Sequence, residues 1–222
     1  MGMLCFLRQF KQILFTTLVL LVGVTALSQV KPKVIAVSKI VPKPISPRHR
    51  EFLHLTADAN VIFSFPTGFR EIAAPNDEYF SYDYAMEIPG HQFEIWFKVR
   101  SQKNDWKNYL AMKNDPRRQL PNPDTGYLAK GRAMAKTLCN DTVSVSRDID
   151  QEVLRRYNAN AGKSYLVDMP YRETTKHYKY ALVLAIEKDH TGTILIVCFT
   201  DEKSPEFFRN VNRISHYLKF KS

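Results

Sequence analysis

Four polar side chains are the candidates for catalysis in this sequence: His177, Asp168, Asp83 and Glu94. Histidine titrates near neutral pH, and a carboxylate that orients it can make it a general acid or base. A hydrolase could use such a site, but the four residues are scattered along the chain. Only the tertiary fold could bring them together, so the sequence supports a hydrolase as a hypothesis without a motif.

The local signatures of the common enzyme classes are absent from the sequence. It contains no GxSxG nucleophile motif, no HExxH zinc motif and neither of the glycine-rich phosphate-binding patterns. Cys139 and Cys198 lack the spacing of zinc ligands. Asp148 and Asp150 resemble the start of a calcium loop, but its glycine and bidentate glutamate are missing, which favours the first turn of a helix. The sequence therefore predicts no metal and no cofactor.

A second group of side chains suggests binding. Residues 93–100 alternate in hydrophobicity, which is typical of a strand with one buried face and one wetter face. Tryptophan and arginine are common anchors of binding surfaces. We expect a contact surface made of Asp83, Glu94, Trp96, Lys98 and Arg100. The alternatives are that helices cover this face, or that it carries ordinary surface ion pairs.

A hairpin would position this surface. Four large side chains recur at every second position and are predicted to share one face: Phe80, Tyr82, Tyr84 and Met86. Pro89 and Gly90 form a turn, and residues 93–100 return as the partner strand. Short strands over residues 61–65 and 69–72 precede the hairpin.

Two helices are expected after the hairpin. The first covers residues 106–112, and the second runs from Asp124 or Thr125 through Leu138. Gly131 lies on the apolar side of the second helix, where glycine is unfavourable unless close packing requires it.

The next helix should begin at Asp148 or Asp150 and end near Gly162. Residues 179–187 and 193–200 are apolar runs joined by a tight turn, which predicts an antiparallel pair of strands.

A last helix should begin at Ser204, followed by Pro205 at its first position. Its buried stripe would consist of Phe207, Val211, Ile214 and Leu218. Hairpins and helices in this order predict an α+β fold, an antiparallel sheet covered by helices.

The N-terminus has the order of a secretory signal. Residues 1–28 contain a basic start, a short apolar run and an A-x-S site, which predicts cleavage before Gln29. An uncleaved membrane anchor is the alternative. No cysteine follows the apolar run, so a lipoprotein is not expected. Residues 29–50 would form a basic, proline-rich arm, and residues 51–222 a single domain.

The net charge of +10 belongs mostly to the two N-terminal segments. Residues 51–222 keep 24 basic side chains against 22 acidic ones. A nucleic-acid-binding domain would carry its excess on the folded face, so no nucleic acid is expected. The arm could touch an anionic surface such as lipid or cell-wall polymer, or it could be a solvated spacer.

Export would place the two remaining cysteines in an oxidising compartment. Cys139 and Cys198 could then form a disulfide with each other, or Cys198 could pack as a small apolar side chain. The sequence leaves both alternatives open.

The order of elements and the aromatic stretch EYFSYDYAMEIPGHQFEIWFKV, with a terminal YLKF, resemble the PsbP-like α-β-α sandwich superfamily. The resemblance spans roughly residues 60–220. It implies a compact domain used mostly for binding or assembly. We therefore expect an exported, non-catalytic binding or assembly module of the cell envelope, which contacts an unidentified protein or envelope component. A periplasmic hydrolase is the alternative.

Overall fold

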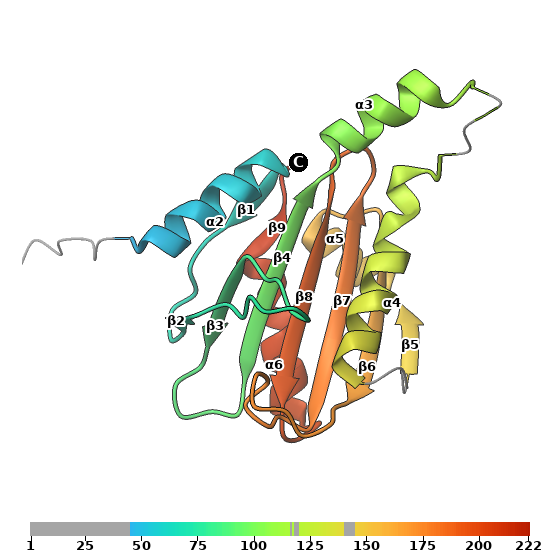
Figure 1. Ribbon diagram of the computed structural model, residues 1–222. Coiled ribbons are helices and arrows are strands. Elements are labelled where there is room, and N and C mark those ends of the chain that lie inside the picture. Colours follow the sequence, from blue (N-terminus) through green and yellow to red (C-terminus); the bar gives the residue numbers. More distant parts are fainter. Residues whose placement is uncertain (1–44, 116, 118–119, 140–144) are drawn as a thin grey trace, which may run out of the picture. The chain divides into compact units, whose positions relative to one another are not determined.

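Figure 1 shows a computed structural model of the chain, which describes residues 45–115, 117, 120–139 and 145–222. Backbone contacts group Pro44–Ser222 into one compact unit. The predicted signal peptide and residues 29–44 of the predicted arm lie outside the described residues. Among the helices that the structure describes, none is long and apolar enough to cross a membrane.

Nine strands form two antiparallel sheets in the described part of the chain. They are β1 (Val61–Phe63), β2 (Arg70–Ile72), β3 (Tyr84–Glu87), β4 (Glu94–Ser101), β5 (Val145–Asp148), β6 (Ala161–Asp168), β7 (Tyr180–Lys188), β8 (Gly192–Thr200) and β9 (Leu218–Phe220). The main sheet has the order β2-β3-β4-β8-β7-β6-β5, and β1 pairs with β9. The predicted antiparallel pairing of β7 with β8 is confirmed.

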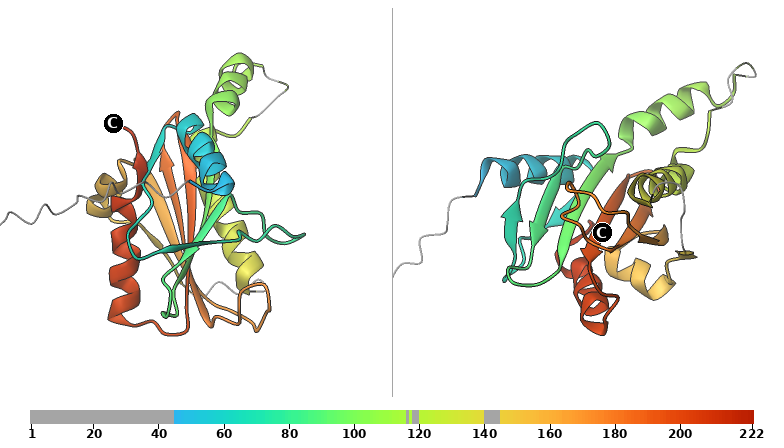
Figure 2. Two further views of the ribbon diagram at one scale, coloured as in Figure 1. Left: turned by 90° about the vertical axis from the view of Figure 1, so that its left-hand side faces the viewer. Right: turned by 60° about the horizontal axis from the view of Figure 1, so that its bottom comes forward.

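Helices cover both faces of the main sheet. The helices of the described residues are α2 (Pro47–Asp58), α3 (Lys103–Met112), α4 (Gly126–Cys139), α5 (Gln151–Tyr157) and α6 (Pro205–Arg213), with the 3₁₀ turns η1 (Pro123–Thr125) and η2 (Ile214–His216). Side chains of α2, α5, α6 and the β1–β9 pair pack in the core on one face, and those of α4 in the core on the other. Figure 2 shows α6 and α4 on opposite sides of the sheet. The predicted α+β fold is confirmed. Helix α3 extends past the end of the sheet and buries none of its side chains (Figure 1).

Gly131 shows why glycine occupies the middle of α4. A Cβ atom there would lie 2.6 Å from the Cβ of Ala185 and 2.8 Å from Cε2 of Tyr165. The helix therefore approaches β6 and β7 too closely for any side chain at this position. This close packing explains why glycine occupies the apolar side of the helix.

The predicted face of the hairpin is wrong. Tyr84 and Met86 pack on the side of α5 and α6, whereas Phe80 and Tyr82 pack on the side of α4. The Asp83 carboxylate accepts the backbone N–H of Val99 at 2.7 Å. This side chain takes the hydrogen bond that a backbone carbonyl of β3 would accept if the strand continued along β4. β3 therefore starts at Tyr84, and residues 73–83 cross over the sheet as a loop.

The third predicted helix ends too late, and two strands were missed. Helix α5 stops at Tyr157 because Asn158 adopts the left-handed conformation with φ 53°, a common helix ending. Gly162 lies in β6 instead, where a Cβ would come within 3.2 Å of the Ala185 carbonyl oxygen. β5 and β6 were hidden because their residues alternate only weakly in hydrophobicity.

The last helix begins as predicted and ends early. The Ser204 hydroxyl accepts the N–H of Phe207 at 3.2 Å, and Pro205 takes the first helical position. The expected stripe is buried, but its last member, Leu218, lies in β9, where it pairs with Phe63 of β1. Tertiary pairing thus converts the end of an apolar helical pattern into a strand.

The predicted boundary at residue 51 falls inside a helix. Ser46 caps α2 by accepting the N–H of His49 at 3.0 Å, and Pro47 occupies the first turn. The Ser46 hydroxyl also donates to the Glu71 carboxylate at 2.6 Å. The end of the predicted arm therefore belongs to the folded domain.

The sheet separates the two cysteines of the domain. Cys139 packs on the face covered by α4, and Cys198 on the face covered by α5 and α6. They do not form a disulfide with each other, and Cys198 is fully buried among apolar side chains.

Replacing Gly131 by alanine should destabilise the domain by about 1–3 kcal/mol, because the added methyl group overpacks the interface of α4 with the sheet. Urea unfolding measures this change. Gly126→Ala is the matched control in the same helix, since its Cβ would meet only the end of the Lys130 side chain. A Gly131→Ala variant as stable as Gly126→Ala would contradict the close approach.

Candidate functional site

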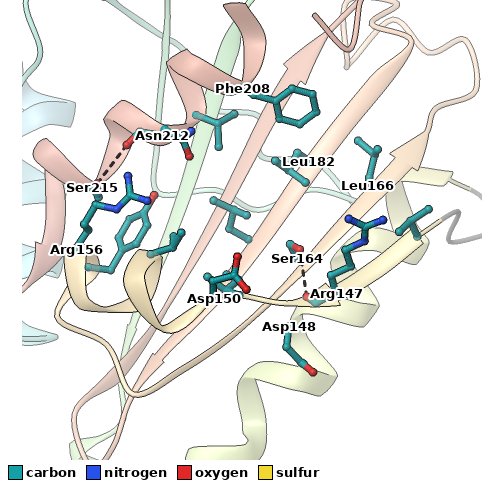
Figure 3. A pocket seen from close by; sticks show the side chains of 16 residues that line it. Arg147, Asp148, Asp150, Arg156, Ser164, Leu166, Leu182, Phe208, Asn212 and Ser215 are labelled. Carbon is teal, nitrogen blue, oxygen red and sulfur yellow. Dashed lines mark hydrogen bonds between the residues drawn. The ribbon is translucent and has the colours of Figure 1, made fainter. Parts of the chain in front are cut away.

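An open pocket lies on the face of the sheet that α5 and α6 cover, beside β5, β6 and β7 (Figure 3). Its volume is about 460 Å³, which falls within the roughly 300–1,000 Å³ typical of small-molecule sites. Most of its lining is apolar and comes from three strands, two helices and the β5–α5 connection. The apolar residues are Val145, Ile149, Val153, Leu166, Leu182, Leu184, Phe208 and Val211.

The pocket exists because α5 and α6 leave part of the sheet uncovered. Along β6, Tyr165 and Val167 are buried under α4, so the alternating residues Ser164 and Leu166 face the pocket. On α6, Phe208 stays 40% exposed beside the pocket. Apolar side chains thus remain in contact with solvent inside a concave surface.

One end of the pocket is rich in hydrogen-bond donors. Figure 3 shows Arg156 beside Asn212 and Ser215, and Tyr157 also lines the pocket. Among the described residues, Arg156 forms an ion pair with Glu152 alone, at 4.0 Å, and the Glu152 side chain is 80% exposed. Such an exposed pair holds the guanidinium weakly, so it remains available to a ligand.

The other end carries charges of both signs. The Asp148 carboxylate is paired with Lys163 at 2.9 Å, and the Ser164 hydroxyl donates to the backbone carbonyl of Arg147. Within the described residues, neither the Arg147 guanidinium nor the Asp150 carboxylate has a hydrogen bond or an ion pair. Asp150 precedes α5, where the helix dipole favours a negative charge.

Sequence reasoning missed this pocket. The sequence indicated Asp148 and Asp150 only as the start of a helix, and it gave no reason to single out Arg147 or Arg156. The lining residues come from elements far apart in the sequence, and two of these strands were not expected.

The predicted contact surface is not an exposed surface. Glu94, Trp96, Lys98 and Arg100 do share one face of β4, but Trp96 and Glu94 are each only 1% exposed. The loop before β3 covers them, and the Trp96 ring lies 4.8 Å from the Tyr82 ring, centroid to centroid. Loops, and not the helices of the first alternative, cover Glu94 and Trp96, whereas the Arg100 side chain stays 43% exposed in an ion pair with Asp83.

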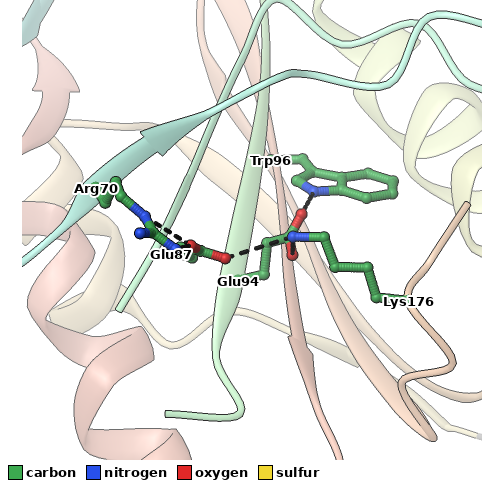
Figure 4. A network of polar contacts seen from close by, with 5 residues as sticks. All are labelled: Arg70, Glu87, Glu94, Trp96 and Lys176. Atoms are coloured by element: carbon green, nitrogen blue, oxygen red, sulfur yellow. Dashed lines mark hydrogen bonds and ion pairs between the residues drawn. The ribbon is translucent and has the colours of Figure 1, made fainter. Parts of the chain in front are cut away.

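Glu94 is the centre of a buried polar network (Figure 4). Its carboxylate accepts the indole N–H of Trp96 at 2.5 Å and the Lys176 ammonium at 2.7 Å. Lys176 also contacts Glu87, which pairs with Arg70. The Arg70 guanidinium lowers the pKa of the Glu87 carboxyl below its usual range. This network fixes the loop before β7 to the β3–β4 hairpin.

The remaining members of the predicted surface also have structural partners. Arg100 donates to the Asp83 carboxylate at 3.0 Å, and the Lys98 ammonium donates to the Ser81 carbonyl at 2.7 Å. Both contacts hold the covering loop on β4.

The four candidate residues of the hydrolase hypothesis have four different partners. The His177 ring stacks on Tyr171 at 3.7 Å. Asp168 pairs with Lys203, Asp83 with Arg100 and Glu94 with Lys176. These contacts do not join the histidine to a carboxylate.

A second buried carboxyl lies at the opposite end of β7. The Glu187 side chain is fully buried, and it accepts the Thr193 hydroxyl at 2.7 Å. Gln102 donates to that hydroxyl at 3.2 Å and to the Pro123 carbonyl at 3.0 Å. Burial and, to a smaller extent, the nearby Asp124 carboxylate raise the pKa of Glu187 to about 8, although the hydrogen bond from Thr193 acts in the opposite direction. This cluster joins the base of α3 to the sheet.

Comparisons with known proteins do not assign the chain to a family. No protein-family model matches the chain, and a search of curated proteins finds no relative. The resemblance to the PsbP-like superfamily stays a prediction. In the parts of the chain that the structure describes, no cluster of three or more His, Cys, Asp or Glu side chains could hold a metal ion.

Replacing Lys176 by methionine should lower the free energy of unfolding by about 2–3 kcal/mol. It leaves the Glu94 carboxylate buried without its cation, a loss of about 3–5 kcal/mol for fully buried pairs. The effect should be smaller here because Lys176 is 51% exposed. Urea unfolding at neutral pH measures the change.

Two further variants identify the cause. Adding Glu94→Gln to Lys176→Met removes the uncompensated charge and should recover most of the loss. Lys103→Met breaks the exposed pair with Asp58 and should cost less than about 1 kcal/mol. Equal losses in the Lys176 and Lys103 variants would argue against a buried network.

Glu187 should make the stability of the domain fall as pH rises. Its pKa is about 8 in the folded state against 4.5 for an unperturbed glutamate, so the folded state holds the proton more tightly than the unfolded state. Between these two pH values, unfolding becomes easier by up to about 1.4 kcal/mol per pH unit. Below pH 4.5 this contribution to stability is fully present.

Glu187→Gln should therefore flatten the pH dependence of urea unfolding, and its stability relative to the original protein should improve from pH 5 to pH 8. Asp189→Asn replaces an exposed acid in the neighbouring turn and should keep the original slope. Parallel profiles for the original protein and Glu187→Gln would refute the assignment.

Proposed function

We propose that this chain is an exported, non-catalytic binding module, and that its pocket beside β5, β6 and β7 holds a small, largely apolar ligand. The observation that carries the proposal is the pocket itself, a concave site of about 460 Å³ with an apolar floor and a few polar groups at its ends. Pockets of this kind are the usual sites of small-molecule recognition.

The chemistry of the lining supports binding over catalysis. Acyl transfer or hydrolysis needs a nucleophile or an activated water next to a base. The titratable groups of the pocket are arginines, aspartates and Tyr157, and Asp148 is already paired with Lys163. The four hydrolase candidates, which have separate partners, do not line this pocket.

The cellular setting is part of the same proposal. The N-terminal signal pattern supports export to the periplasm or the medium, and the basic residues of the segment 29–44 would contact an anionic envelope surface. The domain would then present its pocket outside the cytoplasm. Its partner would be an envelope component or a protein that delivers or receives the ligand.

A fluorescence titration tests pocket binding. The neutral dye N-phenylnaphthylamine should bind the purified protein saturably, with increased emission as it leaves water. Val145→Trp places an indole in the pocket and should weaken dye binding at least tenfold, a loss of about 1.4 kcal/mol.

Ser146→Trp is the matched control. Ser146 is exposed and neighbours Val145 in β5, but it does not line the pocket, because successive strand residues point to opposite faces. Equal loss of dye binding in both variants, or no saturable binding to the original protein, would count against the proposal.

A further inference from the structure

We infer that the ligand of this pocket is a single-chain amphiphilic anion, with its carboxylate at Arg156 and its hydrocarbon chain over the leucines of β6 and β7. This inference rests on the proposed function and specifies the class of ligand. It assigns a direction to the pocket, with a charged end and an apolar floor.

The donors at one end set the position of the anion. Arg156 supplies a guanidinium and Asn212 an amide beside it, whereas the Ser215 hydroxyl already donates to the Asn212 backbone carbonyl at 3.3 Å (Figure 3). Burial raises the pKa of Tyr157, so its hydroxyl stays a neutral donor. A guanidinium and neutral donors suit a carboxylate, which accepts several hydrogen bonds at once.

The acidic groups of the pocket argue for the same direction. Asp148 is neutralised by Lys163, whereas Asp150 carries an uncompensated charge in the described part of the chain. Figure 3 shows Asp150 away from the cluster of Arg156, Asn212 and Ser215. A ligand carboxylate would be repelled by Asp150 and attracted to Arg156.

The floor determines what the rest of the ligand is made of. Leu166 and Leu182 are only partly buried, and Phe208 and Val145 are 40% and 43% exposed. On β6 and β7, Ser164 is the one polar residue among the described residues that line the pocket, and its hydroxyl already donates to the Arg147 carbonyl. An unbranched hydrocarbon chain can cover such a surface without leaving polar groups unpaired.

Competition against N-phenylnaphthylamine tests chain length. In the series hexanoate, octanoate and decanoate, each added methylene should tighten binding by up to about fourfold, the equivalent of a buried CH₂. A series that shows no dependence on chain length would overturn the inference.

The charge is tested with a neutral ligand of the same length. Decanoate should bind about tenfold more tightly than decanol, since hydrogen bonds to charged groups are stronger than neutral ones. Arg156→Ala should abolish this preference without weakening decanol. Arg155→Ala removes a neighbouring positive charge of α5 that does not line the pocket, and it should keep the preference.

Arg147→Ala separates the two ends of the pocket. It should change the preference by less than threefold, and a larger effect there than at Arg156 would overturn the assigned direction. Vesicles of phosphatidylglycerol present anionic headgroups on a surface and should not displace the dye. Displacement by vesicles as effective as that by decanoate would show a membrane surface as the ligand and would also refute the inference.

The two proposals fail in different ways. If the dye does not bind, or if Val145→Trp leaves its binding unchanged, the pocket is not a binding site and the proposed function fails. If the dye and decanol bind but decanoate has no advantage over decanol, the pocket function stands and only the anionic ligand is excluded.

Discussion

Burial of β8 on both faces is the constraint on which the rest of the structure depends. All nine residues of the strand are buried, so the sheet requires a complete layer on each side. Helices supply much of both layers. On the side of α4, however, the helix contacts β6 and β7, and loops must cover β3, β4 and the near part of β8. Loops carry unpaired backbone groups, so each covering loop needs specific polar partners.

Two carboxylates supply these partners. Asp83 takes the place of a strand at the Val99 N–H, which lets the preceding loop cross over Trp96. Glu94 anchors Lys176 in the second loop. Lys176 and His177 both have positive φ, 51° and 63°, a conformation that costs non-glycine residues about 1 kcal/mol or more each. The ion pair to Glu94 offsets part of that strain. The charged residues on this face of β4 therefore hold the covering loops in place, although their pattern in the sequence resembles that of an exposed binding surface.

Local signals in the sequence predicted the elements whose causes are local. Ser204 and Pro205 specify the start of α6, and the run of apolar residues specifies β8. The side of the sheet on which Phe80 packs could not be predicted, because it depends on a hydrogen bond between residues 16 positions apart. β6 was missed for a related reason: its glycine and lysine suit a strand only because α5 and β7 pack against it. The pocket could therefore not be predicted from the sequence, because β5 and β6, which form part of it, were not expected.

The pocket is the place where the cover of the sheet is incomplete. Helix α5 has seven residues and α6 has nine, and together they leave Leu182 and Leu166 partly open. Apolar surface left in water forgoes about 25 cal/mol per Å² of stabilisation. Larger side chains could have filled this gap, as the aromatic residues of the opposite face do around Trp96. An apolar ligand that covers the same surface would recover that free energy, because it would remove the exposed apolar side chains from water. A ligand that binds only the folded state in this way would raise the free energy of unfolding of the domain.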